Sequence, residues 1–395
     1  MQYKKFQEMN LSRLGLGAMR LPKVSGQGEK IDEAKAMELI VYAMENGVNY
    51  FDTAYRYHAG ESELFLGKAL SCYPRESYHL ATKMPGHMME YKNGKYQFSG
   101  LLSSFPGRSP SELFEEQLEK CRTDYFDFYL LHNVCESAWD FYTNEEVGVV
   151  AYLMEQKRKG RIRHLGFSAH GRAETIEQFL TKYHCFEFVQ IQLNYLDWVL
   201  QEAGRKYEII TKHGLPVITM ESVRGGRLAS INTEADAMLK AARPDDSIAS
   251  WAFRFLQGLP NVQLVLSGMS SMEQLRENIA LFSKEDPVTL EERKLLDRVI
   301  EPLLNLVPCT ACRYCTEGCP QSLDIPKLIA MYNEAANSDD FAFMTLGFTL
   351  RAMAESELPA SCIECGNCTQ ICPQGINIPE VMQKFTGLLL QRNKK

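Results

Sequence analysis

Cysteine is concentrated at the C-terminal end of this chain of 395 residues, where eight of the twelve cysteines follow residue 300. These eight form two runs, each with the pattern C-x-x-C-x-x-C-x-x-x-C-P. The first run is Cys309, Cys312, Cys315 and Cys319, and the second is Cys362, Cys365, Cys368 and Cys372. Thiolates repeated at this spacing are typical ligands of 4Fe-4S clusters, which carry one electron at a time.

The spacing also predicts which cysteines share a cluster. Three thiolates on one short loop can reach three irons of the same cubane, whereas the fourth cysteine, followed by proline, reaches the other cluster. We therefore expect one cluster on Cys309, Cys312, Cys315 and Cys372, and the second on Cys362, Cys365, Cys368 and Cys319. The alternative is a pair of zinc sites built from C-x-x-C units, which would not use the third and fourth cysteine of each run.

This cysteine pattern resembles that of bacterial ferredoxins. Compact ferredoxins place the second run close behind the first, whereas residues 320–361 separate the two runs here. The insertion contains two helical-looking segments, residues 325–335 and 341–355, and so resembles the helical ferredoxin modules of succinate dehydrogenases. We therefore expect helices, and not two hairpins, between the cluster loops.

A second set of reactive side chains lies in the first 140 residues: Asp52, Tyr57, Lys83 and His132. An ammonium group beside a phenol favours the phenolate, and so lowers a pKa that is ordinarily about 10. Asp52 would keep Lys83 charged and oriented, and His132 could polarise a carbonyl group held between it and Tyr57. Each residue alone has an ordinary structural explanation, such as a helix cap or packing, but the combination indicates acid-base chemistry on a carbonyl.

The elements that must position these side chains are eight short, β-rich apolar segments, each followed by a helical pattern. The segments are residues 13–19, 48–53, 78–83, 126–132, 162–168, 186–193, 215–220 and 262–268. Eight strand-helix units predict an α/β fold of the (β/α)8 TIM barrel type, in which chemistry takes place at the C-terminal ends of the strands. A doubly wound open sheet is the alternative, but no G-x-G-x-x-G turn opens a helix after the first segment.

We expect three segments in the chain: a barrel over residues 1–285, a linker and docking helix over 286–305, and a smaller, mainly helical ferredoxin-type domain over 306–395. Asp286-Pro287 ends one helix, and an amphipathic helix begins near Thr289. Residues 88–108 are longer than a usual connection and could form either a substrate lid or a solvated excursion.

Residues 3–285 resemble the aldo-keto reductases in the segments FDTAYRYHAGESELFLGKAL, ATKMP, YLLHN, GFSAH, QIQLNYLD and SGMSSMEQLREN. The resemblance implies NAD(P)H-dependent reduction of an aldehyde or ketone. Tyr57 would donate the proton, Lys83 would lower its pKa, Asp52 would support Lys83, and His132 would orient the carbonyl. With the cysteine runs included, the whole chain resembles the iron-sulfur branch of that family.

The same resemblance assigns the cofactor residues. Ser168 and Gln190 would hold the nicotinamide carboxamide, Met220 stands where an aromatic residue normally stacks on the nicotinamide, and residues 268–278 would wrap the adenosine end. That last segment contributes Gly268, Gln274 and Asn278. Ala169-His170 follows Ser168 where the family has Asn, and GMSSMEQ lacks basic side chains for a 2′-phosphate, so the choice between NAD and NADP stays open.

The two cofactor types differ in electron count, because nicotinamide transfers a hydride and each cluster passes one electron. A flavin such as FMN could convert between them. Three functions therefore stay open: a reductase coupled to its clusters, a carbonyl reductase with structural or redox-sensing clusters, and a non-catalytic adaptor that docks a ferredoxin or flavodoxin.

Composition limits the partners. The net charge of −7 gives no basic surface for nucleic acid. No segment approaches the roughly twenty apolar residues of a membrane span, and the first residues lack the features of a secretory signal. We therefore expect a cytoplasmic protein without a membrane span that acts on a small carbonyl substrate.

Overall fold

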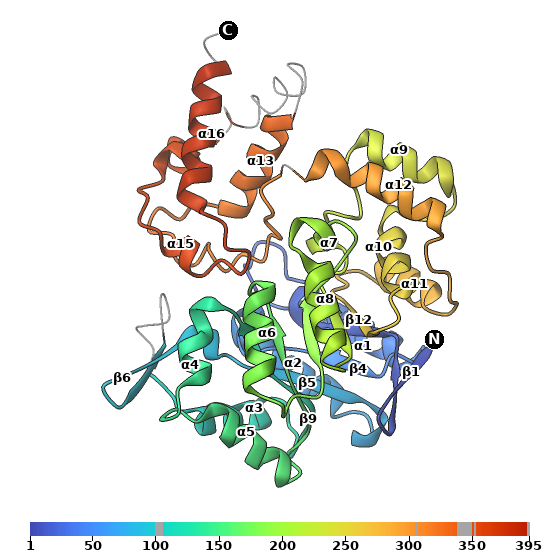
Figure 1. The fold of residues 1–395 in the computed structure, drawn as a ribbon, viewed down its shortest axis with the longest axis vertical. Coiled ribbons are helices and arrows are strands. Elements are labelled where there is room, and N and C mark those ends of the chain that lie inside the picture. Colours follow the sequence, from blue (N-terminus) through green and yellow to red (C-terminus); the bar gives the residue numbers. More distant parts are fainter. Residues whose placement is uncertain (99–105, 305, 338–349, 351–352, 393–395) are drawn as a thin grey trace. The chain divides into compact units, whose positions relative to one another are not determined.

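The computed structural model describes residues 1–98, 106–304, 306–337, 350 and 353–392. It consists of two compact units, of which the first ends at Glu301 and the second begins at Pro302. Figure 1 draws the barrel strands of the first unit and the helices of both.

The first unit is a closed barrel of eight parallel strands, which confirms the predicted fold. Each predicted segment overlaps one barrel strand: β3 (Leu14–Gly17), β4 (Tyr50–Asp52), β5 (His79–Met84), β8 (Phe126–Val134), β9 (Ile162–Ala169), β10 (Val189–Gln192), β11 (Val217–Met220) and β12 (Val262–Ser267). Strands β5, β8 and β9 extend one or two residues beyond the predicted ends. The segments are recognisable because a parallel strand is covered on both faces and is therefore mostly apolar. All nine residues of β8, for example, are buried.

Helices surround the barrel (Figure 1). The longer ones are α1 (Glu33–Glu45), α2 (Glu61–Leu70), α3 (Pro110–Lys120), α5 (Val149–Arg158), α6 (Ala173–Lys182), α8 (Ala203–Lys212), α9 (Thr233–Ala242), α10 (Ile248–Gln257), α11 (Met272–Leu281) and α12 (Leu290–Ile300). Two short helices, α4 (Trp139–Thr143) and α7 (Asp197–Leu200), lie in the connections after β8 and β10. Their position after strand ends places them on the side where the reactive residues are expected.

An N-terminal hairpin that the sequence did not predict packs onto the barrel interior. Strands β1 (Tyr3–Phe6) and β2 (Met9–Ser12) pair antiparallel. Phe6 contacts Phe128 at a ring-centroid distance of 5.3 Å and Phe188 at 6.2 Å. Because these partners lie near the beginnings of β8 and β10, the hairpin covers the end of the barrel opposite the strand C-termini.

A second hairpin lies in the long connection at residues 88–108. Strands β6 (Met89–Lys92) and β7 (Lys95–Phe98) pair antiparallel. Asn93 and Gly94 join them with φ values of 52° and 73°, as a type I′ turn requires. Residues 99–105 lie outside the described residues, so the lid and excursion interpretations stay predictions.

The second unit is mainly helical, as predicted. It contains α13 (Ile325–Asn337), α15 (Asn367–Gln370) and α16 (Ile378–Arg392). Helix α13 lies at the first predicted helical segment, whereas most of the second, residues 341–355, lies outside the described residues. Side chains of α13 and α16 pack together, for example Tyr332 against Phe385 at 5.9 Å. Three of the eight clustered cysteines, Cys309, Cys315 and Cys368, belong to the same core.

Helix α12, expected in the linker, is part of the barrel unit, which extends to Glu301 and so beyond the expected boundary at 285. Its apolar face is buried. Glu292 at its start accepts hydrogen bonds from Arg254 at 2.7 Å and Arg243 at 2.6 Å. The side chain of Arg254 is completely buried, so Glu292 neutralises a charge inside the barrel unit.

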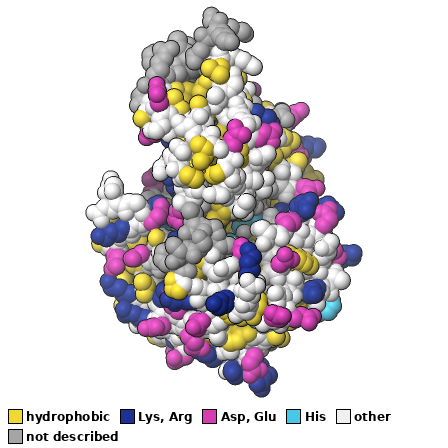
Figure 2. Space-filling view, turned by 90° about the vertical axis from the view of Figure 1, so that its left-hand side faces the viewer, with side chains coloured by type: hydrophobic (Ala, Val, Ile, Leu, Met, Phe, Trp, Pro, Cys, Tyr) yellow, Lys and Arg dark blue, Asp and Glu magenta, His cyan; other side chains and the backbone are white. Residues whose placement is uncertain are grey.

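The surface of the described molecule carries both signs of charge. On the face shown in Figure 2, Lys and Arg side chains are interspersed with Asp and Glu side chains.

Among the described residues, no helix combines the length and the apolar character needed to cross a membrane.

Replacing Glu292 with alanine should lower the free energy of unfolding of the barrel unit by about 2–3 kcal/mol, because it removes a carboxylate from the buried Arg254. Glu291→Ala, one residue away and exposed, should cost less than about 0.5 kcal/mol. Tryptophan fluorescence during urea denaturation measures this unit alone, because Trp139, Trp198 and Trp251 all lie in it. Equal effects of the two variants would contradict the assigned role of Glu292.

The same carboxylate predicts a pH dependence. Burial would raise the pKa of Glu292, but hydrogen bonds from Arg254, the Thr289 backbone and Arg243 bring it down to about 2. A depressed pKa stabilises the folded state above the ordinary value of about 4.3, and this stabilisation is lost as the pH falls from there towards 2. The difference between Glu292→Ala and the unaltered protein should therefore shrink over that range.

Candidate functional site

A fully buried lysine forms the centre of the strand-end site. Lys83 on β5 donates hydrogen bonds to Asp52 Oδ1 at 2.6 Å and to the Thr53 carbonyl at 2.7 Å, and its Nζ lies 3.4 Å from the Tyr57 hydroxyl. Strands β4 and β5 pair in parallel next to these residues, which brings Asp52 and Lys83 to the same end of the barrel. Burial lowers the pKa of Lys83, and Asp52 opposes that shift.

Tyr57 is held by a turn of unusual backbone conformation. After Tyr57, His58 and Ala59 have φ values of 53° and 56°, a region that residues other than glycine rarely adopt. The buried His58 ring holds the turn, since its Nε2 accepts a hydrogen bond from the Leu21 amide at 3.2 Å and its Nδ1 lies 3.0 Å from the Glu29 carbonyl oxygen. Tertiary contacts, and not local propensity, therefore position the phenol.

His132 completes the predicted group. Its ring lies 6.1 Å from the Tyr57 ring at an interplanar angle of 84°. Burial lowers the pKa of His132 well below its ordinary value, and His87, Lys83 and His170 lower it further. The imidazole is therefore neutral at pH 7, and a carbonyl oxygen between Tyr57 and His132 would meet two uncharged hydrogen-bond donors with a buried ammonium group behind one of them.

Two further histidines, which the sequence did not identify as site residues, are near enough to His132 to lower its pKa. The His87 ring, in the connection after β5, is 4.5 Å from the His132 ring. His170 follows β9, and its Nδ1 is buried without a hydrogen-bond partner among the described residues. Burial lowers the pKa of His87 to about 4 and that of His170 to about 3. A stretch of neutral imidazoles therefore continues from the Tyr57 region.

The residues expected at the nicotinamide lie next to each other on adjacent strands. Ser168 pairs in register with Gln190, and Gln190 Nε2 lies 3.5 Å from Met220 Sδ. Ser168 Oγ accepts a hydrogen bond from the amide of Asn133 at 2.9 Å. Gln190 Oε1 and Asn133 Oδ1 are buried without hydrogen-bond partners among the described residues. Two such acceptors suit the NH₂ group of a carboxamide, so the residues present fit a nicotinamide.

The residues expected at the adenosine end form a separate group around the start of α11. Asn278 donates to Ser267 Oγ at 3.1 Å, and Gln274 Oε1 accepts from the Ser270 amide at 2.8 Å. Gly268 lies directly between β12 and this group. The guanidinium of Arg276 lies over the Tyr42 ring, 5.4 Å from its centroid.

In the second unit, four thiols line one cavity: Cys319, Cys362, Cys365 and Cys368. Apolar side chains, among them Leu323, Ile325, Ile378 and Met382, form the rest of its wall. The set combines the last cysteine of the first run with three of the second. Four thiols around an apolar hollow are the donor set that a 4Fe-4S cluster requires.

The other four cysteines are also close to one another. Burial raises the pKa of the Cys315 thiol, and the neighbouring Cys312, Cys309, Cys372 and Cys368 raise it further. Cys372 in turn is affected by Cys309. Within the part of the chain that the structure describes, no three His, Cys, Asp or Glu side chains form a group that could bind a single metal ion. This spacing is expected for a cubane, because each of its four irons takes one thiolate and the four sulfur ligands therefore lie farther apart than the ligands of a single ion.

Comparisons with known proteins also divide the chain into a barrel and an iron-sulfur domain. Residues 13–301 match the model of the aldo/keto reductase family, and residues 308–376 match that of a 4Fe-4S dicluster domain. The NADH-specific methylglyoxal reductase of Escherichia coli is 28% identical over 69% of this chain and 90% of its own length. The L-galactose dehydrogenase of Arabidopsis thaliana is 24% identical over 75% of this chain and 93% of its own.

Among solved structures, the holo form of an aldo-keto reductase from Bacillus halodurans is similar with a TM-score of 0.58 and 25% identity. The match covers 76% of this chain and 96% of that one.

The crossed cysteine assignment predicts the iron content of paired variants. Anaerobically prepared protein should hold about eight irons per chain. Cys319→Ser/Cys365→Ser removes two ligands of one cluster and should leave about four irons, whereas Cys319→Ser/Cys312→Ser removes one ligand of each cluster and should leave far fewer. Cys72→Ser, an exposed thiol of the barrel unit, is the control. If each run bound its own cluster, the results of the two paired variants would be exchanged.

Proposed function

Because the chain belongs to the aldo/keto reductase family and ends in a 4Fe-4S dicluster domain, we propose that this oxidoreductase reduces an aldehyde or ketone in its barrel with a nicotinamide cofactor. The observation that carries the proposal is the buried Lys83 ammonium group, bonded to Asp52 at 2.6 Å and lying 3.4 Å from the Tyr57 hydroxyl. A buried charge beside a phenol is costly for folding and has a direct use in proton transfer.

Each side chain of the site has one role in the proposed reduction. Reduced nicotinamide, when bound, supplies the hydride that adds to the carbonyl carbon. Tyr57 donates its proton to the carbonyl oxygen, and Lys83 stabilises the negative charge left on the phenol oxygen. Asp52 keeps Lys83 protonated against the effect of burial. The neutral His132 donates a hydrogen bond to the same carbonyl oxygen and so orients the substrate.

The cofactor is proposed to be NADH. The serines and the glutamine of residues 270–274 bond to each other or to the Arg20 carbonyl, and Arg276 lies on Tyr42. A 2′-phosphate would find no bidentate arginine among these contacts. The Escherichia coli relative is named an NADH-specific enzyme, which supports the same choice.

Tyr57→Phe should lower kcat/KM for aldehyde reduction by about 10²- to 10⁴-fold, because it removes the proton donor. The Kd for NADH, measured by calorimetry, should not change. Tyr55→Phe is the matched control, since the Tyr55 hydroxyl bonds to Glu116 and not to Lys83. In the unaltered protein NADH should give a higher kcat/KM than NADPH. If Tyr57→Phe left every turnover unchanged, the chain would be an electron-transfer adaptor.

The clusters are proposed to exchange electrons with the barrel chemistry through a bound flavin, with a ferredoxin or flavodoxin as external carrier. The support is the electron count, since a flavin accepts either a hydride or single electrons and a cluster passes one electron. A reducing compartment such as the cytoplasm, which keeps the cysteines available to iron, is our prediction for its location.

Denaturation of anaerobically prepared protein should release FMN as well as iron. The Cys319→Ser/Cys365→Ser protein should keep its fold, measured by circular dichroism, and lose reduction driven by an external one-electron donor. If NADH-driven aldehyde reduction proceeded normally in that variant and no flavin were released, the clusters would be structural or redox-sensing and the proposed electron route would be wrong.

A further inference from the structure

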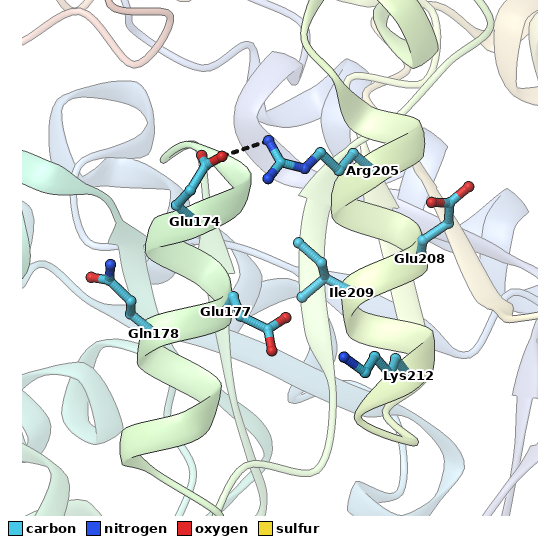
Figure 3. A pocket seen from close by; sticks show the side chains of 7 residues that line it. All are labelled: Glu174, Glu177, Gln178, Arg205, Glu208, Ile209 and Lys212. Carbon is cyan, nitrogen blue, oxygen red and sulfur yellow. Dashed lines mark ion pairs between the residues drawn. The ribbon is translucent and has the colours of Figure 1, made fainter.

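Helix α8 has two faces of different character. Its outer face forms a groove with α6, lined by Glu174, Glu177, Gln178, Arg205, Glu208, Ile209 and Lys212. Figure 3 shows Arg205 paired with Glu174 across this groove and Lys212 further along the same helix. These charged side chains are at the surface, where water and opposite charges are available. The buried face of α8 consists of Ala203, Gly204, Ile210 and, unexpectedly, a lysine, Lys206.

Lys206 is only 7% exposed. It forms no hydrogen bond or ion pair with any residue that the structure describes. A lysine side chain is almost never this buried unless its ammonium group is paired. The mechanism proposed above does not use Lys206, so its burial needs another explanation.

The carboxylates near Lys206 are already engaged. Asp197 accepts hydrogen bonds from Gln192, Asn194 and Arg224 at 2.6–3.2 Å. Glu136 accepts from Thr175 at 2.6 Å and from the amide of Arg172 at 2.9 Å. Glu202, the third carboxylate close enough to influence Lys206, lies 3.9 Å from Arg205. The chain surrounds Lys206 with acidic residues that are committed to other donors.

Lys206 is connected to the carbonyl site through the histidines. It is close enough to His170 to affect the charge on that ring, and His170 affects His132. His132 stands beside His87 at 4.5 Å and faces Tyr57 at 6.1 Å. The imidazoles of His132, His87 and His170, which can donate hydrogen bonds, therefore lie near Tyr57 on one side and near Lys206 on the other.

We propose that Lys206 and His170 bind an anionic group at the far end of the carbonyl substrate, so that the substrate is an aldehyde or ketone that carries a carboxylate or phosphate. This inference rests on the proposed carbonyl reduction. An anion provides a direct partner for the ammonium group of this buried side chain, and the neutral His170 imidazole gains an acceptor or a proton when the anion binds. A substrate bound by its carbonyl at Tyr57 and by its anionic group at Lys206 would be held in one orientation.

The test compares substrates that differ only in charge. Succinic semialdehyde is compared with butanal, para-carboxybenzaldehyde with benzaldehyde, and glyceraldehyde phosphate with glyceraldehyde. The unaltered enzyme should prefer the charged member of at least one pair by about tenfold or more in kcat/KM, as expected for a hydrogen bond to a charged group. Preference in the first two pairs identifies a carboxylate, and preference in the third identifies a phosphate.

Lys206→Gln should abolish this preference and leave kcat/KM for the neutral aldehyde within about twofold. Lys206→Arg, which keeps the charge, should retain most of the preference, and it serves as the test if the glutamine variant does not fold. Lys212→Gln, on the outer face of the same helix, is the matched control and should behave as the unaltered enzyme. Equal kcat/KM values within every pair, or a preference that survives Lys206→Gln, would overturn the proposal.

A binding measurement distinguishes the proposed anion site from the proposed carbonyl reduction. In Tyr57→Phe protein, calorimetry measures the Kd of succinic semialdehyde, para-carboxybenzaldehyde and glyceraldehyde phosphate without turnover. When Lys206→Gln is added to this variant, the Kd of the preferred ligand should rise by about tenfold or more. If no aldehyde is reduced but this binding difference is found, carbonyl reduction fails and the anion site stands. If aldehydes are reduced but Lys206→Gln does not change anion binding, the anion site fails and carbonyl reduction stands.

Discussion

The interaction on which the active barrel depends is the hydrogen-bonded ion pair of Lys83 and Asp52. Neither side chain is appreciably exposed, and the two charged atoms are 2.6 Å apart. Burial penalises both charges, as the lowered pKa of Lys83 and the raised pKa of Asp52 indicate. Such a pair contributes little net stability, but breaking it leaves one charge uncompensated. The barrel must therefore hold the ends of β4 and β5 in one register for the pair to exist.

A second buried network supports that register from outside the barrel. Glu63 on α2 accepts hydrogen bonds from Thr82 and Gln117, both at 2.6 Å. Gln117 on α3 also donates to the backbone carbonyl of Lys83 at 3.1 Å and accepts from Tyr129 on β8 at 2.5 Å. Two helices and two strands thus fix the backbone beside Lys83. The ammonium group keeps its position relative to Tyr57 because the polar groups behind it are paired.

The sequence was sufficient to predict those features that follow from the barrel topology. Asp52, Lys83 and His132 could be placed together because parallel strands bring their C-terminal ends to one side, whatever the rotamers are. The β6–β7 hairpin was not predicted, although Asn93-Gly94 between tyrosine-rich segments is a strong signal for a type I′ turn. The position of Phe6 could not be derived, because it depends on contacts with Phe128 and Phe188 that are far away in sequence. His87 and Asn133 were missed for the same reason: only the folded connections bring His87 onto His132 and the Asn133 amide onto Ser168.

The two buried lysines of the barrel show how a similar local environment leads to different chemistry. Burial lowers the pKa of both Lys83 and Lys206. Lys83 has its own carboxylate, so its charge is balanced within the chain and can act on Tyr57. Lys206 has no hydrogen-bonded carboxylate among the described residues, because Asp197 and Glu136 are bonded to other donors. These carboxylates favour its charge without bonding to it, and the proposed anion would supply the direct partner. In the proposed arrangement, the imidazoles therefore lie between an ammonium group that can bind an anion and the proton donor Tyr57. A substrate that satisfied both would be held at two points, whereas a neutral aldehyde would be held only at its carbonyl and would be free to rotate about it.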